Sequence, residues 1–360
     1  MPDIDRRRGK WVARWRDPGG TQHSRSFERK LDAQRFLTGL DADRLRGVYT
    51  DPRAGQITLR EYAEQRWLPA QVHLRPNSVS LYGGHLRNHI VPLLGDRPVG
   101  SIRRPDAKTF VAAISASLAP ATVSTVYAVL RTVLQSAVDD GLIAANPASR
   151  VPLPRVETAP FVLLTAPQIS ALARSITPRY EVTVWLAAGA GLREGEALGL
   201  TVPRVEFLAR RLSIVEQAQH GVLSPLKTRA SRRVVPVDDL VLNAVTAHIQ
   251  RWAPGPWQLV VTNRCGRPVR RNSFGMCWRE AVKAAGLAEG TRFHDLRHFY
   301  ASTLIAAGLN PKEIQSRLGH ATITETMDTY GHLFPDADEH GRGALDAAFA
   351  AGQASGRDVR

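Results

Sequence analysis

The chain is poor in cysteine, with only two among its 360 residues. Cys265 and Cys277 form no CxxC pair and have no other cysteine near them. Neither a disulfide framework nor a cysteine-rich metal site is therefore expected. We expect both to be ordinary thiols in a reducing cytoplasm.

Long hydrophobic runs are missing as well. The best candidate, residues 182–190, has the length of a buried helix and falls short of the roughly 18 residues that a membrane span needs. The basic N-terminus is followed by no apolar run, so we expect no signal peptide. These absences argue against a membrane partner and favour a cytoplasmic location.

Acidic residues are too few to balance the basic ones. The 48 Lys and Arg residues exceed the 33 Asp and Glu residues, for a formal net charge of +15. Such a charge says nothing about the fold, but it favours an acidic polymer as partner. Residues 1–50 hold twelve basic and seven acidic residues, so the start of the chain carries about a third of the excess and is expected to bind that partner.

The pattern of the first half predicts two domains. Residues 1–55 alternate apolar and basic positions around a DPGG turn and then become helical, which predicts a small α+β module. The alternative is a basic hairpin that only packs on the rest of the chain. Residues 56–150 read as four helices. The clearest stripe, ahead of a capping Gly141, consists of Val123, Val126, Tyr127, Leu130, Val133, Leu134, Ala137 and Val138.

The second half is of mixed character. Residues 151–164 are rich in proline and predict an extended linker. Residues 165–350 are mostly helical, with strand-like pieces between about 202 and 237 that predict a small antiparallel sheet. Residues 351–360 are expected to be disordered. The predicted fold class is multidomain and mainly α, with small antiparallel sheets.

Two basic positions in this last domain have unusual surroundings. Arg193, in GLREGEAL, lies at a predicted helix start, with Glu196 one turn further on to orient it. Lys227 lies between two strand-like pieces and so near a hairpin tip, where the neighbouring Arg229, Arg232 and Arg233 would favour release of its proton. The alternatives are a surface ion pair for Arg193 and a solvated basic loop for Lys227.

The segment HDLRH predicts an anion site on a helix. His294, Arg297 and His298 share one helical face through their i, i+3, i+4 spacing. Two histidines at i, i+4 can bind zinc, but the arginine between them would repel the ion and the glutamate of HExxH is absent. Guanidinium and imidazole donors suit a phosphate better. His298 is the more readily explained as a buried, hydrogen-bonded side chain.

A histidine and a tyrosine follow. His320 comes after a short helix capped by Asn310, so we expect it exposed at the end of a rigid element, with a simple helix-dipole contact as the alternative. Tyr330 stands in the polar run TMDTYGHLF, whereas Tyr127 and Tyr180 are predicted to pack. A tyrosine after two anion-binding stretches can serve as a nucleophile.

Together these motifs resemble the tyrosine recombinase family, most closely the phage-type integrases. The resemblance covers GLREGEAL, KTRASRRVVPV, FHDLRHFYAS, RLGH and MDTYGHLF, in the family's order of Arg, Lys, HxxR, His and Tyr. It implies an arm-binding domain with a three-stranded sheet and a helix over residues 1–55, a helical, SAM-like core-binding domain over 56–150, and a catalytic domain over 165–350. It also implies a C-terminal tail that packs on a neighbouring subunit, or on its own domain.

The resemblance further implies site-specific DNA recombination through a 3′-phosphotyrosyl intermediate, with no metal, cofactor or ATP. The implied roles are a nucleophile, Tyr330; phosphate ligands, Arg193, Arg297 and His320; a proton donor, Lys227; a base or phosphate donor, His294; and a supporting carboxylate, Glu196.

The implied partners are double-stranded DNA with core-type and arm-type attachment sites, and a homotetramer on that DNA, in the cytoplasm and associated with the nucleoid. An excision factor and a host DNA-bending protein are left open. Integration or excision of a phage or other mobile element is the leading hypothesis. A resolvase-type tyrosine recombinase is an alternative that the basic N-terminal module disfavours, and a type IB topoisomerase is one that the C-terminal tail and the two DNA-binding units disfavour. A non-catalytic DNA-binding regulator would not need the complete set of site residues.

Overall fold

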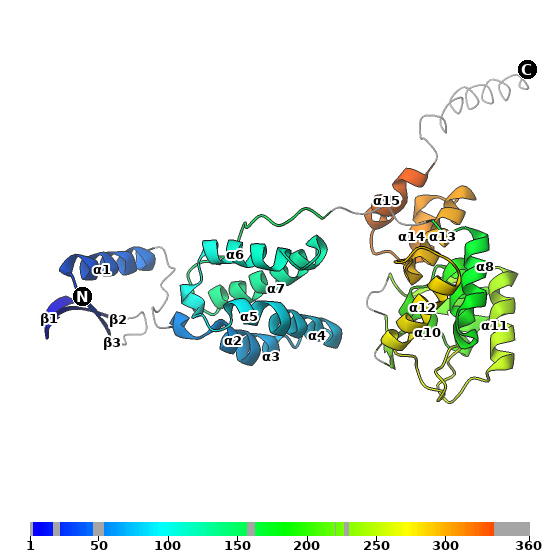
Figure 1. The fold of residues 1–360 in the computed structure, drawn as a ribbon, viewed down its shortest axis with the longest axis horizontal. Coiled ribbons are helices and arrows are strands. Elements are labelled where there is room, and N and C mark those ends of the chain that lie inside the picture. The colour runs from blue at the N-terminus through cyan, green and yellow to red at the C-terminus, as the bar shows by residue number, and fades with distance from the viewer. Residues whose placement is uncertain are drawn as a thin grey trace, which may run out of the picture. The chain divides into compact units, whose positions relative to one another are not determined.

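The computed structural model describes residues 3–16, 22–45, 54–156, 163–219, 221–226 and 230–334, with the backbone alone for 42–45. The chain divides into two compact units, Met1–Thr158 and Ala159–Arg360 (Figure 1). Lys227 lies outside the described residues. The same is true of part of the expected linker, of the C-terminal tail and of the expected disordered end. No helix in the described ranges is long and apolar enough to cross a membrane.

The first unit begins with a sheet and a helix, as the resemblance implies. β1 (Asp3–Arg7), β2 (Lys10–Arg16) and β3 (Gln22–Phe27) pair antiparallel in the order β1-β2-β3, and α1 (Lys30–Leu45) follows. A small core joins the helix to the sheet and consists of Ala13, Trp15, Ala33, Leu37 and Leu40. Periodicity alone did not predict β1, because this edge strand, DIDRR, has a single apolar residue and depends on backbone pairing.

Helices fill the rest of the first unit. In chain order they are α2 (Leu59–Glu61), α3 (Leu68–Ala70), α4 (Pro76–His85), α5 (Val91–Leu94), α6 (Arg104–Ser115) and α7 (Pro120–Asp139). The π-helical turns η2 (Tyr62–Trp67) and η3 (Leu86–Ile90) join α2 to α3 and α4 to α5. The predicted stripe on α7 is buried except at Val138, which is half-buried, and Gly141 has a left-handed φ of 71° as expected of a cap.

The second unit is built around α9 (Glu181–Ala190), whose residues are almost all buried. It contacts α8 (Ala166–Ser175), α10 (Glu194–Leu198), α11 (Asp239–Arg251) and α13 (Phe293–Ala306). The remaining helices are α12 (Arg271–Ala284), α14 (Pro311–Leu318) and α15 (Ile323–Tyr330). In Figure 1, α13, α14 and α15 lie next to one another at one end of this unit, which brings the HDLRH, RLGH and TMDTY segments together.

Two small sheets replace the single one that was predicted. β4 (Val205–Glu206), β5 (Arg211–Ile214) and β8 (Arg233–Pro236) pair in the order β4-β5-β8, while β6 (Glu216–Gln219) pairs with β7 (Val222–Pro225). The strands on either side of Lys227, β7 and β8, do not pair with each other, so the predicted hairpin is wrong. Burial explains the pairing, because Leu212 and Val235 face each other in register and both are fully buried.

Candidate active site

Arg193 is presented by the sharp turn between α9 and α10. α9 ends at Gly191, which has a φ of 64° and leaves no room for a Cβ beside the Tyr300 ring. Arg193 then becomes the N-cap of α10. Its backbone N–H donates to Oε2 of Glu196 at 2.9 Å and its Nη1 to Oε1 at 3.0 Å. The arginine side chain is 34% exposed and the glutamate side chain 2% exposed, so this pair is anchored in the interior rather than being a surface ion pair.

Glu196 also binds a second arginine, Arg233, which was expected only to contribute charge to the loop around Lys227. Arg233 on β8 donates from Nη1 to Oε1 at 3.0 Å and from Nη2 to Oε2 at 2.8 Å. Burial by itself raises the pKa of Glu196, but the hydrogen bonds and charge of Arg233, followed by Arg193, lower it to about 2. The missed signal was strand alternation, because Arg233 points inward with Val235 while Val234 is exposed.

Arg297 on α13 is 1% exposed and connects two loops of the site. Its Nη1 donates to the carbonyl oxygen of Gly191 and its Nη2 to that of Leu318, both at 2.6 Å. Its Nε is buried without a hydrogen-bond partner among the described residues. Burial, and then the charges of Arg193 and Arg233, lower its pKa to about 9, which leaves the guanidinium charged at neutral pH.

His320 is buried, at 7% exposure, and the expectation of an exposed histidine is wrong. The residue follows Gly319, the left-handed cap of α14, and the next helix, α15, folds back over it. Its Nδ1 lies 2.8 Å from the Thr326 hydroxyl. Burial, and then the charges of Arg297 and Arg193, lower its pKa to about 3, so the ring is neutral at physiological pH. The predicted Asn310 cap is confirmed.

Tyr330, the last residue of α15, is 1% exposed and belongs to the hydrophobic core. The polar run around it suggested otherwise, but α15 turns Thr326 and Tyr330 inward at i, i+4 and its other polar residues outward. The hydroxyl lies 2.9 Å from Nδ1 of His298, and the ring is parallel to that of His320, with centroids 6.5 Å apart. Burial raises the pKa of Tyr330 to about 12, against the lowering effect of Arg297 and Arg193.

The two histidines of α13 have different environments. His298 is 6% exposed, which confirms the expectation of a buried, hydrogen-bonded side chain. His294 is exposed at the start of the helix, with its ring edge-to-face against His298 at 4.9 Å. Loss of hydration, and then the charge of Arg297, lower the pKa of His294 to about 4. Both rings are therefore neutral at physiological pH.

The described residues contain no group of three or more His, Cys, Asp and Glu side chains that could hold a metal ion.

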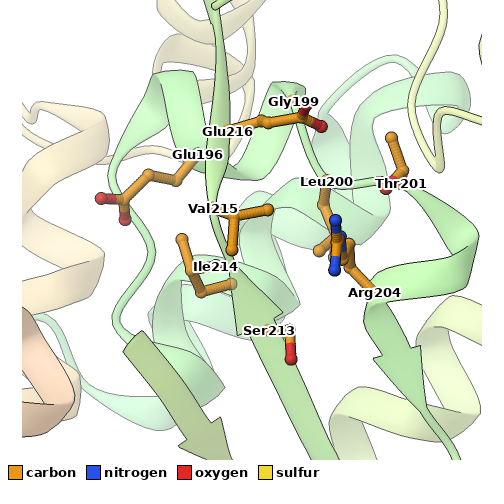
Figure 2. Close-up of a pocket in the computed structure, with 9 residues that line it drawn as sticks. All are labelled: Glu196, Gly199, Leu200, Thr201, Arg204, Ser213, Ile214, Val215 and Glu216. Atoms are coloured by element: carbon orange, nitrogen blue, oxygen red, sulfur yellow. The ribbon is translucent and has the colours of Figure 1, made fainter. Parts of the chain in front are cut away.

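A small pocket lies between the end of α10 and the strands β5 and β6. Its lining includes Glu196, Arg204, Ser213 and Glu216 (Figure 2). Figure 2 shows the Glu196 carboxylate directed away from Arg204 and Ser213.

Comparisons with known proteins agree with this geometry. The model of the phage integrase family matches residues 163–336, and that of the phage integrase central domain matches residues 61–152. The integrase of Mycobacterium phage L5 is 28% identical over 320 residues, which are 84% of this chain and 84% of that one.

Two solved structures share the fold. The Tn1549 transposon integrase in complex with transposon right-end DNA aligns with a TM-score of 0.68 and 23% identity, covering 81% of this chain and 99% of that one. A lambda integrase tetramer bound to a Holliday junction aligns with a TM-score of 0.60 and 19% identity, covering 90% and 97%. With the family models matched across both units, the chain belongs to the phage integrase family and is a tyrosine recombinase, a site-specific recombinase of the integrase type.

Proposed function

We propose that this recombinase cuts and rejoins DNA strands through a 3′-phosphotyrosyl intermediate on Tyr330, and that it integrates or excises a phage or other mobile element. The main support is that the segments carrying Arg193, Arg297 and His320 are joined by hydrogen bonds and meet near Tyr330. Arg297 donates to the carbonyl groups of Gly191 and Leu318, and Arg193 donates to that of Gly319 at 3.3 Å. His320 comes next in the chain, parallel to the Tyr330 ring. Cationic and imidazole donors thus surround one tyrosine.

The chemical step follows from these positions. Oη of Tyr330 forms a bond to phosphorus while the bond from phosphorus to the 5′-oxygen breaks. Arg193, Arg297 and His320 stabilise the charge that develops on the non-bridging oxygens. The Nε–H of Arg297 has no hydrogen-bond partner among the described residues and is suited to bind one of those oxygens. If the Thr326 hydroxyl donates to Nδ1 of His320, the ring proton is on Nε2, from which it can be donated to a second non-bridging oxygen.

Three further residues complete the proposal. Lys227 protonates the departing 5′-oxygen, because an alkoxide is a poor leaving group. His294, exposed beside the buried Arg297, acts as a base or a phosphate donor. Glu196 holds Arg193 in place by accepting one hydrogen bond from its guanidinium and one from its backbone N–H.

We propose double-stranded DNA and further copies of the chain, as a homotetramer, as the partners. The net charge of +15 supports the first. We also propose that residues 1–55 bind arm-type sites, 56–150 bind core-type sites and 165–350 catalyse, with 151–164 as the linker. Strand register places Arg7, Lys10, Arg14 and Arg16 on the face of the N-terminal sheet opposite buried Trp15. Asp5 lies on the same face and pairs with Arg7 and Arg14, and Lys10 pairs with Glu28, so binding to a DNA backbone would exchange these carboxylates for phosphates.

The experiment is to trap the covalent intermediate. A duplex that spans an attachment site and carries a nick near the cleavage point loses its short 5′-hydroxyl product, so rejoining is prevented and the adduct accumulates. We expect the wild-type chain to form a denaturant-resistant protein–DNA adduct and Tyr330→Phe to form none. An equal yield from Tyr330→Phe refutes the assignment of the nucleophile. Specific binding without any adduct supports a regulator instead.

A further inference from the structure

The proposed reaction leaves open which group accepts the Tyr330 proton, because His294 was given two alternative roles and its ring contacts His298 rather than the Tyr330 hydroxyl. Tyr330 must lose its hydroxyl proton to attack phosphorus, yet burial raises the pKa of this phenol to about 12. Only a minute fraction of such a phenol is ionised at neutral pH, so a group in contact with the hydroxyl has to accept the proton as the new bond forms.

His298 has the geometry for this task. Its Nδ1 lies 2.9 Å from Oη of Tyr330, both side chains are buried, and the rings meet edge-to-face with centroids 5.6 Å apart. The other histidines are less suitable. His320 presents Nδ1 to the Thr326 hydroxyl at 2.8 Å, and the ring of His294 contacts that of His298 at the exposed start of α13.

His298 is also in the protonation state that a base requires. Burial lowers its pKa to about 4, so the ring is neutral at physiological pH and one nitrogen carries a lone pair. The charged groups that act on it are Asp295, whose carboxylate raises the pKa, and Arg292 and Arg297, which lower it. Asp295 is 1% exposed, so its charge helps to stabilise an imidazolium once the proton has moved.

We propose that His298 is a catalytic residue that accepts the Tyr330 proton during strand cleavage and returns it during rejoining. The proposal rests on the proposed role of Tyr330 as nucleophile and adds the proton step to it. The Oη–H bond breaks as the proton moves to Nδ1, Oη bonds to phosphorus, and the 5′-oxygen leaves with a proton from the donor assigned to Lys227. Rejoining reverses each transfer, so the cycle consumes no proton and leaves His294 to bind phosphate.

The same hydrogen bond could instead hold the tyrosine away from DNA, and kinetics separate the two roles. An asparagine at 298 places an amide close to the position of Nδ1 and keeps a hydrogen bond, but it cannot accept a proton. We expect His298→Asn to form the covalent adduct about 10²-fold more slowly than wild type, a typical loss for a missing general base. A rate equal to or faster than wild type overturns the proposal, and a faster one identifies the contact as a restraint.

A substrate with sulfur in place of the 5′-oxygen distinguishes base from acid, because a thiolate leaves without protonation. On this duplex His298→Asn should still form the adduct slowly, whereas Lys227→Ala should regain a rate of adduct formation close to that of wild type. Recovery of His298→Asn overturns the assignment of a base. The matched control is His294→Asn, the neighbouring histidine on the same helix, which should lower the rate without changing its pH dependence.

The wild-type pH profile tests the proposal even if His298→Asn proves unstable. With a neutral internal base, the rate of adduct formation should change little between about pH 6 and pH 8, whereas proton loss to solvent gives roughly a tenfold rise per pH unit. A rate that rises about tenfold per pH unit overturns the proposal. A wild-type chain that binds DNA but forms no Tyr330-dependent adduct overturns the proposed function itself, and this outcome is distinct from a slow His298→Asn beside an active wild type.

Discussion

Arg233 and Glu196 form a buried two-point ion pair, with Nη1–Oε1 and Nη2–Oε2 distances of 3.0 and 2.8 Å and side chains that are 4% and 2% exposed. Arg193 binds the same carboxylate. Nε of Arg233 also donates to the carbonyl oxygen of Arg317 at 2.7 Å. One carboxylate therefore holds together α10, β8 and, through Arg233, the end of α14 that precedes His320.

Removing the charge of Glu196 should be costly. Glu196→Gln leaves Arg233 buried without a counterion, and breaking a buried ion pair from one side typically costs about 3–5 kcal/mol. We expect a clear drop in the free energy of unfolding, measured by urea or thermal denaturation of the full chain. The control is Asp239→Asn, which breaks the exposed pair with Arg210 and should cost under about 1 kcal/mol. Equal losses from the two variants would contradict the special role of Glu196.

The buried histidines should make the fold sensitive to mild acid. The pKa values of His298 and His320 are lowered from 6.5 to about 4 and about 3. A folded-state pKa below the unfolded one gives stability that is complete above pH 6.5 and is lost as the pH falls toward the folded value. We expect the wild-type Tm to fall between about pH 7 and pH 5, and the fall to be smaller in His298→Asn. An unchanged pH dependence in that variant would show that His298 is not the group responsible.

Gly319 should tolerate no side chain. It has a φ of 67°, and a Cβ there would lie 2.9 Å from Cδ of Arg233. We expect Gly319→Ala to displace His320 and Arg233 and to abolish most strand cleavage in the adduct assay. The matched control is Gly308→Ala, which has a φ of 83° but no described residue within 4 Å of the new Cβ. Both variants should lose about 1 kcal/mol of stability through backbone strain, but Gly308→Ala should keep its activity.

DNA affinity should fall steeply with salt. Each phosphate that the protein neutralises releases about one counterion, so log K decreases linearly with log[salt]. Replacing Arg7 and Arg14 on the open face of the N-terminal sheet with glutamine should reduce that slope by about two on arm-type DNA. Fluorescence anisotropy across a salt series measures it. An unchanged slope would show that this face does not contact the backbone.

Strand cleavage should survive an excess of EDTA. The proposed ligands of the reacting phosphate are the guanidinium groups of Arg193 and Arg297 and the ring of His320, which supply the positive charge and N–H donors that metal ions supply elsewhere. The measurement is adduct yield with and without the chelator. Activity that is lost in EDTA and restored by Mg²⁺ would contradict this mechanism.

Local signals predicted the helical framework of the site. Spacing placed Arg297 and His298 on one face of α13, and the capping pattern positioned the start of α14 at Asn310. Arg193 at the start of α10 followed from the glycine-rich end of α9. These features depend on residues within a turn or two of each other, so the sequence displays them directly.

Features that depend on distant contacts were missed. The burial of Tyr330 and His320 arises because α15 packs back onto the core, which a polar local sequence conceals. The partner of β8 is β5, selected by burial of Leu212 and Val235 rather than by nearness in the chain. The inward direction of Arg233 was visible in strand alternation, but its acceptor lies 37 residues away in the chain.

The two carbonyl contacts of Arg297 affect how the enzyme can be engineered. Because this side chain supports both the turn before Arg193 and the loop that carries His320, its variants will be scored as inactive whether chemistry or folding is lost. Libraries that aim to retarget recombination therefore have little to gain from diversity around α13, where most clones would be discarded for stability alone. Diversity placed in the exposed residues of the first unit, which we propose binds the attachment sites, leaves both carbonyl contacts of Arg297 intact.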